Sequence, residues 1–274
     1  MKFPLKGKYL AMLAPSFVVD FTYPKVISQL RELGFDKVVE LTFGAKMINR
    51  EYHKQLKNSQ KLIISSVCPG IVETIKSKYS SFKKNLILVD SPMSATAKIC
   101  RKTYPSHKIV FISPCNFKRV EAQESKYIDY VIGYDELLEL LTKRGLIHKK
   151  YKKDSFDKFY NDYTKVYPLS GGLYKTSHIK NILTKKEAKI IDGIAKVEAF
   201  LKKPEKGVRF LDVTFCKGGC IGGPSISSKA SLNERKKKVL EYASLAEKEC
   251  ISKENIGLIK RAKKISFKSL YPNK

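Results

Sequence analysis

Four of the six cysteines in this chain of 274 residues occupy similar positions in the sequence. Each lies just after an apolar run, in a loop rich in proline, glycine or serine; these are Cys68, Cys115, Cys216 and Cys220. Apolar runs of this kind are typical of buried strands, and the carboxyl ends of parallel strands are where α/β proteins gather ligands. We therefore expect the four thiols to converge. Four thiolates can hold a tetrahedral zinc ion or an iron-sulfur cluster.

The spacing of the cysteines favours an iron-sulfur cluster. Structural zinc sites usually use two close C-x2-C pairs, whereas here Cys68 and Cys115 are isolated and the closest pair, Cys216 and Cys220, is C-x3-C. Four glycines lie in and after that pair, so backbone amides can approach the sulfur atoms and tune a cluster. Lys118 could offset the charge of thiolates or hold an anionic ligand. Zinc and unligated or redox-active thiols remain the alternatives.

The remaining two cysteines are predicted to be core residues. Cys100 follows a predicted helix start at Ser91 and Pro92 and shares its apolar face with Met93, Ala97 and Tyr104. Cys250 shares a face with Val239, Ala243 and Ala246 in a helical stretch after Pro224.

The elements that position these residues follow an α/β pattern. Short apolar runs, each typical of a strand covered on both faces, alternate with helical patterns; the runs are 37–41, 61–65, 86–89, 108–113 and 129–133. Residues 144–165 have weak periodicity and are predicted to be a connection. A second α/β unit follows, with a helix beginning at 170–172 and a strand over 208–213.

Composition limits the classes of function. The 54 lysines and arginines exceed the 26 acidic residues by 28, but only eight of the cations are arginine and the clusters are scattered, which disfavours nucleic acid. A lysine bias or a docking face for an acidic protein explains the charge better. No apolar stretch is long enough to span a membrane, and the run 9–21 is interrupted by Pro15 and Asp20 and lacks a signal cleavage site. Sparse cysteines indicate a reducing cytoplasm.

Three segments, in the correct order, resemble the iron-only (FeFe) hydrogenases. Residues 65–70 (SSVCPG) resemble T-S-C-C-P, residues 113–121 (SPCNFKRVE) resemble M-P-C-x-x-K-x-x-E, and residues 213–223 (VTFCKGGCIGG) resemble V-M-x-C-x-G-G-C-x-x-G-G. Shorter matches to the family's A-P-S, F-G-A, S-P and T-G-G segments occur at 14–16, 43–45, 91–92 and 170–172. The resemblance thus runs over nearly the whole chain.

The resemblance implies one catalytic domain over residues 1–274 with an α/β fold. Two lobes, each a mostly parallel twisted sheet flanked by helices, would enclose the cofactor. The lobes are expected at 27–142 and 165–274, and residues 1–26 could join the second. The implied cofactor, the H-cluster, is a 4Fe-4S cubane joined to a diiron unit that carries carbon monoxide, cyanide and a bridging dithiolate amine.

The resemblance also implies roles for individual residues. Cys68, Cys115, Cys216 and Cys220 would hold the cubane, and Cys220 would bridge to the diiron unit. Lys118, the other residue expected to be catalytic, would contact a cyanide, and Glu121 would support its loop. Pro15 and Ser16 would line the second cyanide. The other expected cofactor-binding positions are Ser66, Val67, Pro114 and Thr214.

The departures from the family pattern concern proton movement. Val67 replaces the cysteine that relays protons in the family, and Tyr52 and Gln55 stand where an acidic pair is expected. Ser113 and Thr214 replace methionines. Slow interconversion of protons and electrons with dihydrogen is therefore expected, with a noncatalytic hydrogen or redox sensor, or a 4Fe-4S electron-transfer or assembly protein, as the alternative.

Partners follow from the same resemblance. The sequence contains no C-x2-C-x2-C-x3-C run, so electrons are expected from a separate carrier such as an acidic ferredoxin. Maturation proteins would deliver the cofactor in an anaerobic cytoplasm.

Overall fold

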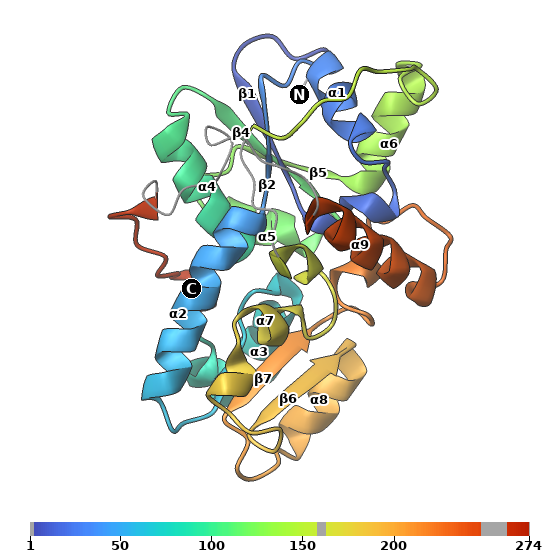
Figure 1. Cartoon of the computed structure of the whole chain (residues 1–274). Helices are drawn as coiled ribbons and strands as arrows, with labels where there is room; N and C mark the ends of the chain where they lie inside the picture. The colour runs from blue at the N-terminus through green and yellow to red at the C-terminus, as the bar shows by residue number, and fades with distance from the viewer. Residues whose placement is uncertain (1–2, 158–162, 248–261, 274) are drawn as a thin grey trace.

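Two parallel sheets, one above the other in Figure 1, organise the chain. A computed structural model describes residues 3–157, 163–247 and 262–273. The upper sheet has the order β2-β1-β4-β5 and the lower sheet the order β3-β7-β6. The strands are β1 Tyr9–Leu13, β2 Lys37–Glu40, β3 Ile63–Ile64, β4 Lys108–Ser113, β5 Tyr130–Gly133, β6 Ala188–Asp192 and β7 Phe210–Thr214.

Helices cover both sheets, and α2 runs from one sheet to the other along the left side of Figure 1. The α-helices are α1 Lys25–Glu32, α2 Thr42–Asn58, α3 Pro69–Lys78, α4 Pro92–Thr103, α5 Phe117–Gln123, α6 Tyr134–Lys143, α7 Gly172–Thr176, α8 Ile194–Lys202 and α9 Leu232–Glu247. The 3-10 helices are η1 Pro15–Val19, η2 Ser80–Asn85, η3 Tyr163–Val166, η4 Ile179–Asn181, η5 Cys220–Gly222 and η6 Tyr271–Asn273. In the described residues no helix is both long and apolar enough to cross a membrane.

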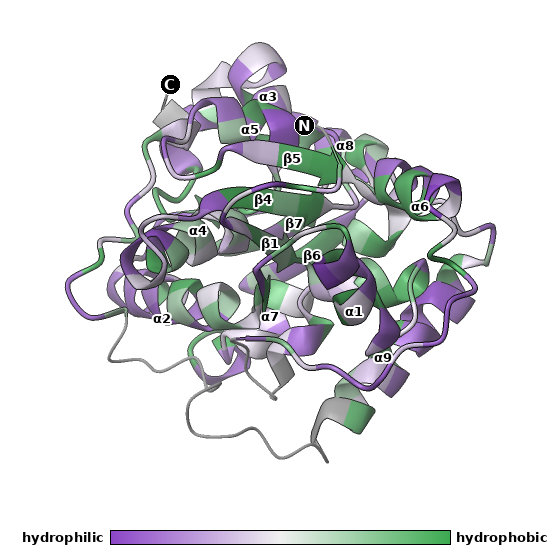
Figure 2. Cartoon of the chain, turned by 90° about the horizontal axis from the view of Figure 1, so that it is seen from above, coloured by the Kyte–Doolittle hydropathy of each residue, from purple (hydrophilic) through white to green (hydrophobic). Residues whose placement is uncertain are grey.

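The upper sheet is apolar on both faces, as expected for parallel strands covered by helices. Alternate residues of β1 point to opposite sides: Leu13 joins the core beneath α1 and α6, while Met12 joins the core beneath α4. Seen from above, the strands are mostly hydrophobic and the helices around them carry hydrophilic outer sides (Figure 2). The predicted α/β fold with parallel sheets flanked by helices is therefore confirmed.

Two segments lie in a different sheet from the one expected. Strand β1 pairs with β2 and β4, so this part of residues 1–26 belongs to the upper sheet and not to the second lobe. Strand β3, from the range expected for the first lobe, pairs with β7 in the lower sheet. The predicted strand at 86–89 forms only isolated bridges, Ile64 with Leu86 and Val89 with Lys268. Pairing between distant segments decides these placements, and local apolar patterns do not carry that information.

Helix α4 begins as predicted. Pro92 is its first residue, and the Ser91 hydroxyl accepts a hydrogen bond from the Ser94 N–H at 3.3 Å. Cys100 is buried in the core, as predicted, whereas Cys250 lies outside the described residues. Helix α2 crosses α4 closely at Gly44, where an added Cβ would lie 2.1 Å from the Thr96 hydroxyl oxygen.

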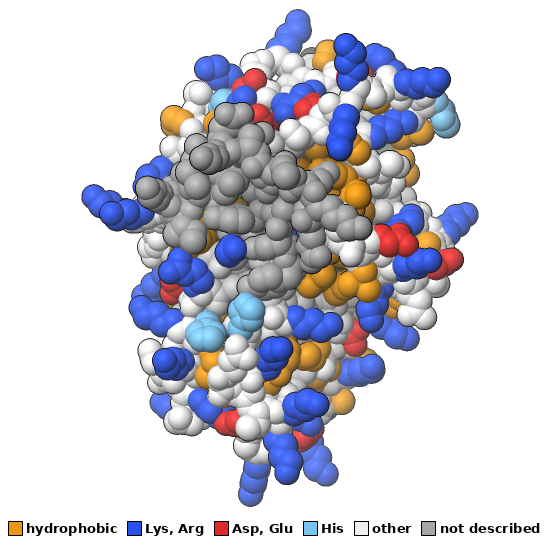
Figure 3. Space-filling view, in the orientation of Figure 1, with side chains coloured by type: hydrophobic (Ala, Val, Ile, Leu, Met, Phe, Trp, Pro, Cys, Tyr) orange, Lys and Arg blue, Asp and Glu red, His pale blue; other side chains and the backbone are white. Residues whose placement is uncertain are grey.

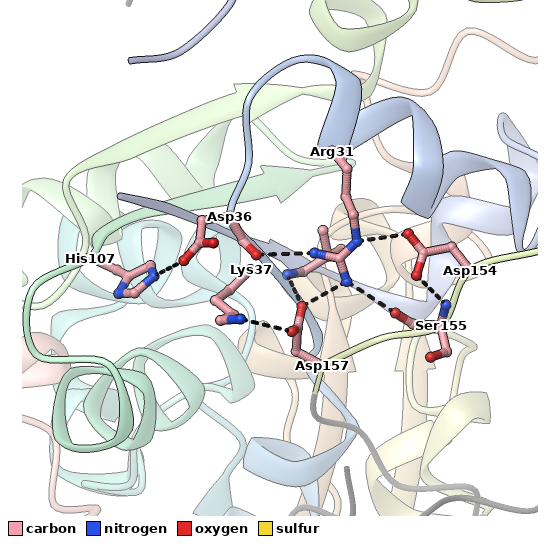
Figure 4. A network of polar contacts seen from close by, with 8 residues as sticks. Arg31, Asp36, Lys37, His107, Asp154, Ser155 and Asp157 are labelled. Atoms are coloured by element: carbon pink, nitrogen blue, oxygen red, sulfur yellow. Dashed lines mark hydrogen bonds and ion pairs between the residues drawn. The ribbon is translucent and has the colours of Figure 1, made fainter. Parts of the chain in front are cut away.

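The predicted connection after α6 is bound to the upper sheet (Figure 4). Arg31 of α1 donates to Asp154 at 2.7 Å and to Asp157 at 3.0 Å. The Val38 N–H of β2 donates to the same Asp157 carboxylate at 2.8 Å. These bonds hold residues 154–157 beside β2 as the chain approaches the lower half of the molecule.

A buried ion pair fixes the chain after this connection. Lys165 of η3 lies 2.5 Å from the Glu40 carboxylate at the end of β2, and the two side chains are 1% and 0% exposed. The Tyr242 hydroxyl of α9 donates to the other Glu40 oxygen at 2.7 Å. Because buried charges are costly unless they are paired, this cluster fixes η3 and α9 against the carboxyl end of β2.

Candidate metal centre

Three loops bring the four predicted cysteines together. Cys68 precedes α3 after β3, Cys115 follows β4, and Cys216 and Cys220 follow β7. Strands β3 and β7 are parallel neighbours, so their loops leave the same edge of the lower sheet. The Phe215 N–H donates to the Cys68 sulfur at 3.4 Å, which ties these two loops together.

The loop of Cys115 belongs to the upper sheet and packs against the chain that follows Cys220. The Ser225 N–H donates to the Pro114 carbonyl at 3.1 Å. At Gly223 an added Cβ would lie 2.2 Å from the same carbonyl oxygen, so only glycine permits this approach. Residues 223–225 thus join the loop after β4 to the loop after β7.

The turn between Cys216 and Cys220 also depends on glycine. Gly218 and Gly219 have φ values of 82° and 84°, which residues with a side chain rarely adopt. The Cys220 N–H donates to the Pro168 carbonyl at 2.7 Å, and an added Cβ on Gly219 would lie 2.6 Å from that oxygen. The turn therefore packs the backbone at Cys220 against the segment that precedes α7.

Burial and neighbouring thiols raise the pKa of three of the cysteines. Burial raises the pKa of Cys115, Cys68 raises it further, and Lys118 opposes the rise. Burial together with Cys68 and Cys115 raises the pKa of Cys216 to about 12. Burial and all three other thiols raise the pKa of Cys220. A cation that shares these thiols would reverse the effect, because a coordinated thiol is deprotonated.

A cavity of about 100 Å³ lies between the loops and is lined mostly by apolar side chains. The predicted site residues in its wall are Pro15, Val67, Cys68, Pro114, Cys115, Lys118, Thr214 and Cys220. Cys220 keeps exposed surface although protein surrounds it, because it faces this cavity. The predicted residues that do not line the cavity are Ser16, Ser66, Glu121 and Cys216.

Two of these residues are engaged in hydrogen bonds inside the protein. The Ser16 hydroxyl lies 2.8 Å from the Tyr134 hydroxyl. The Ser66 hydroxyl donates to the Ile87 carbonyl at 2.7 Å, and the Ser66 N–H donates to the Tyr52 hydroxyl at 3.0 Å. Both serines therefore stabilise the segments that form the cavity wall without lining the cavity themselves.

Lys118 and Glu121 form a buried ion pair on α5. The ammonium lies 2.5 Å from the carboxylate and also donates to the Val67 carbonyl at 3.2 Å. The other Glu121 oxygen accepts from the hydroxyls of Ser91 and Ser94 at the start of α4, at 2.5 and 2.9 Å. Helix α4 thus orients Glu121, and Glu121 holds the Lys118 ammonium at the cavity.

The donor set suits a thiolate-bound cluster. Four mutually interacting thiols surround the site, and a backbone N–H already donates to one of the sulfur atoms. An ammonium offers a partner for an anionic ligand in the same cavity. Within residues 3–157, 163–247 and 262–273, no three His, Cys, Asp or Glu side chains are grouped tightly enough to hold a single metal ion.

Asp212 and Tyr167 are among the polar residues of the cavity wall that are absent from the predicted set. Asp212 of β7 is buried, accepts from the Tyr174 N–H at 2.8 Å, and has its pKa raised by that burial to about 6. An acidic residue within an apolar strand run is a signal that could have identified it. Tyr167 also lines the cavity, but it follows a stretch of weak periodicity that gives no such signal.

The chain is similar in sequence to known proteins. The chain is 26% identical to iron hydrogenase 1 of Clostridium pasteurianum over 89% of its own length, and 22% identical to the probable cytosolic Fe-S cluster assembly factor oxy-4 of Caenorhabditis elegans over 81%. It spans 53% and 62% of the lengths of these relatives.

Solved structures give the same fold. An FeFe-hydrogenase from Chlamydomonas reinhardtii superposes with a TM-score of 0.69 at 16% identity, covering 94% of this chain and 89% of that one. An FeFe-hydrogenase whose structure revealed stepwise H-cluster assembly superposes with a TM-score of 0.68 at 17% identity, with the same coverage. The family model described as iron only hydrogenase large subunit, C-terminal domain, matches residues 7–224, and the chain belongs to that family.

Proposed function

We propose that this protein binds an H-cluster and interconverts protons and electrons with dihydrogen, using an external electron carrier. The observation that carries the proposal is the approach of four thiols from three loops to a mostly apolar cavity, which a largely buried lysine also lines. Family membership supports iron as the metal.

Different residues would hold different parts of such a cofactor. Cys68, Cys115, Cys216 and Cys220 would hold the 4Fe-4S cubane, and Cys220 would also link it to a diiron unit with carbon monoxide, cyanide and a dithiolate bridge. When bound, the cofactor supplies electron storage and the position at which protons and electrons combine. The Lys118 ammonium would donate to a cyanide, and Pro15 and Pro114 would exclude water.

Proton transfer to the cofactor would lack the groups that the family uses for it. Val67 lines the cavity at the position of the family's relay cysteine, and its side chain can neither donate nor accept a proton. The family's relay serine falls near Ile87 in this sequence, and Ile87 is buried and apolar. We infer slow turnover, because efficient transfer needs steps of hydrogen-bond length between groups of suitable pKa.

Val67 also favours a second candidate function, in which the protein binds a cluster but does not turn over hydrogen. A protein that binds a cluster without turning over hydrogen has no need of a relay. It would act as a hydrogen or redox sensor, or as a 4Fe-4S electron-transfer or assembly protein. The similarity to a probable Fe-S cluster assembly factor supports this alternative.

The charge of the chain supports an acidic electron carrier such as a ferredoxin. Lysine and arginine side chains spread over the face shown in Figure 3, in keeping with the net charge of +28. A positive surface raises the association rate of an acidic partner. We extend the proposal to maturation proteins that insert the diiron unit, in an anaerobic cytoplasm.

Infrared spectroscopy of the matured protein distinguishes the two functions. Protein reconstituted with iron and sulfide, and then supplied with the diiron unit without air, should show bands of bound carbon monoxide and cyanide and should evolve hydrogen. The Cys220→Ser variant is the control, because it removes the proposed link between the two parts of the cofactor. A cubane without those bands would favour the noncatalytic function.

A further inference from the structure

The hydroxyl of Tyr167 is a buried donor without an acceptor. In the part of the chain that the structure describes, this oxygen has no hydrogen-bond partner. Buried hydroxyl groups in proteins are almost always paired. Tyr167 lines the cavity between the cysteine loops. A group bound in that cavity is therefore the available hydrogen-bond acceptor for this hydroxyl.

The ring of Tyr167 is held at this place. Two residues earlier, Lys165 forms the buried pair with Glu40. The Tyr167 N–H donates to the Thr164 carbonyl at 3.0 Å, and an added Cβ on Gly172 would lie 2.3 Å from the Tyr167 carbonyl oxygen. Packing against the core between α2 and α7 then fixes the side chain. The hydroxyl therefore has little freedom to find an acceptor elsewhere.

The surroundings keep this hydroxyl protonated. Burial raises the pKa of Tyr167 well above its ordinary value, and Tyr52, Asp212 and Cys220 raise it further. Tyr167 and Cys220 both line the same cavity. A neutral phenol next to thiolates and sulfides can donate its O–H to them.

We propose that Tyr167 donates a hydrogen bond to the group held by the four cysteines and thereby sets its reduction potential. This inference rests on the proposed iron-sulfur cofactor but not on hydrogen turnover. Reduction adds negative charge to a cluster, so a donor stabilises the reduced form more than the oxidised form. Removal of the donor should therefore lower the potential.

The test compares two phenylalanine substitutions in protein that carries the cubane alone. Tyr167→Phe should change the ratio of reduced to oxidised cluster about tenfold, a shift of about 59 mV to lower potential for one electron. Tyr52→Phe is the matched control, because the Tyr52 hydroxyl is also inside the protein but already accepts a hydrogen bond from the Ser66 N–H. A redox titration followed by electron paramagnetic resonance measures both.

The outcomes separate this inference from the proposed function. Equal potentials in wild type and Tyr167→Phe, or equal shifts in both variants, would overturn the role of Tyr167 alone. Wild-type protein that binds no iron would overturn the cofactor and this inference together. If Tyr167→Phe does not fold, electron-nuclear double resonance decides on wild-type protein whose tyrosines carry oxygen-17 at the phenol: a reduced cluster without coupling to that oxygen refutes the hydrogen bond, and the exchangeable proton of the Phe215 N–H at Cys68 does not interfere.

Discussion

Replacement of Lys118 by methionine removes the cation that reaches the cavity while keeping a chain of similar length. Its partner Glu121 is 5% exposed and Lys118 itself 12%, so both charges are buried. Loss of one partner of a buried pair typically costs about 3–5 kcal/mol of unfolding free energy. Glu121 keeps two serine hydroxyl donors in the variant, so we expect the lower value, about 3 kcal/mol.

A double-mutant cycle isolates the pair. Glu121→Gln alone should also destabilise the protein, because Lys118 then lacks its counterion. The double variant Lys118→Met with Glu121→Gln contains neither charge, so its cost should fall short of the sum of the single variants by about 2 kcal/mol. Urea unfolding followed by circular dichroism, at one fixed level of cluster loading and without air, measures all four proteins.

An exposed pair on a helix is the control. Lys143 and Glu139 on α6 lie 2.5 Å apart, but they are 71% and 63% exposed. Exposed pairs typically contribute less than about 1 kcal/mol, so Lys143→Met should change little. If the costs of Lys118→Met and Glu121→Gln simply add, Glu121 does not hold the lysine, and the structural basis for its role at the cavity is lost.

The remaining predictions concern protonation, turnover and partner binding. Burial raises the pKa of Asp212 from 3.8 to about 6, so this carboxyl should contribute a fall of about 3 kcal/mol in unfolding free energy as pH rises through that interval; urea unfolding at each pH should show it as the difference between wild type and Asp212→Asn. A variant as pH-dependent as wild type would refute that assignment. Val67→Cys restores a group that can carry a proton beside the cavity and should raise the rate of hydrogen evolution; an unchanged rate would show that protons do not pass this position. Electron transfer from an acidic ferredoxin should slow steeply as salt is added, and a rate independent of ionic strength would indicate that the lysines are only a bias of composition.

The sequence predicts best the strands that form apolar runs with clear ends. Strands β2, β4 and β5 lie within their predicted apolar runs. Strand β6 is half-exposed and mixes Lys189 with isoleucines, so no apolar run marks it. The apolar residues of β1 continue into those of η1, so the sequence does not show where this strand ends. Assignment of β3 to the lower sheet depends on its pairing with β7, about 150 residues away.

The site was predictable to the extent that its residues follow strands. The four cysteines could be grouped from the sequence because each follows an apolar run, and the carboxyl ends of parallel strands gather ligands. Ser16 and Ser66 differ from this group, since the structure places their hydroxyls in internal hydrogen bonds behind the cavity. Tyr167 could not be identified, because a buried hydroxyl without a partner is a property of tertiary packing and leaves no pattern in the chain.

The most direct test of the central claim is the iron and sulfide content of protein reconstituted without air, compared with four variants that each replace one of Cys68, Cys115, Cys216 and Cys220 by serine. Wild type should bind about four irons and four sulfides per chain and show the absorption and resonance signals of one cubane. Each variant should lose or alter that cluster, whereas Cys100→Ser, in the buried core, should retain it. Zinc in place of iron, or iron binding that survives all four substitutions, would contradict the account.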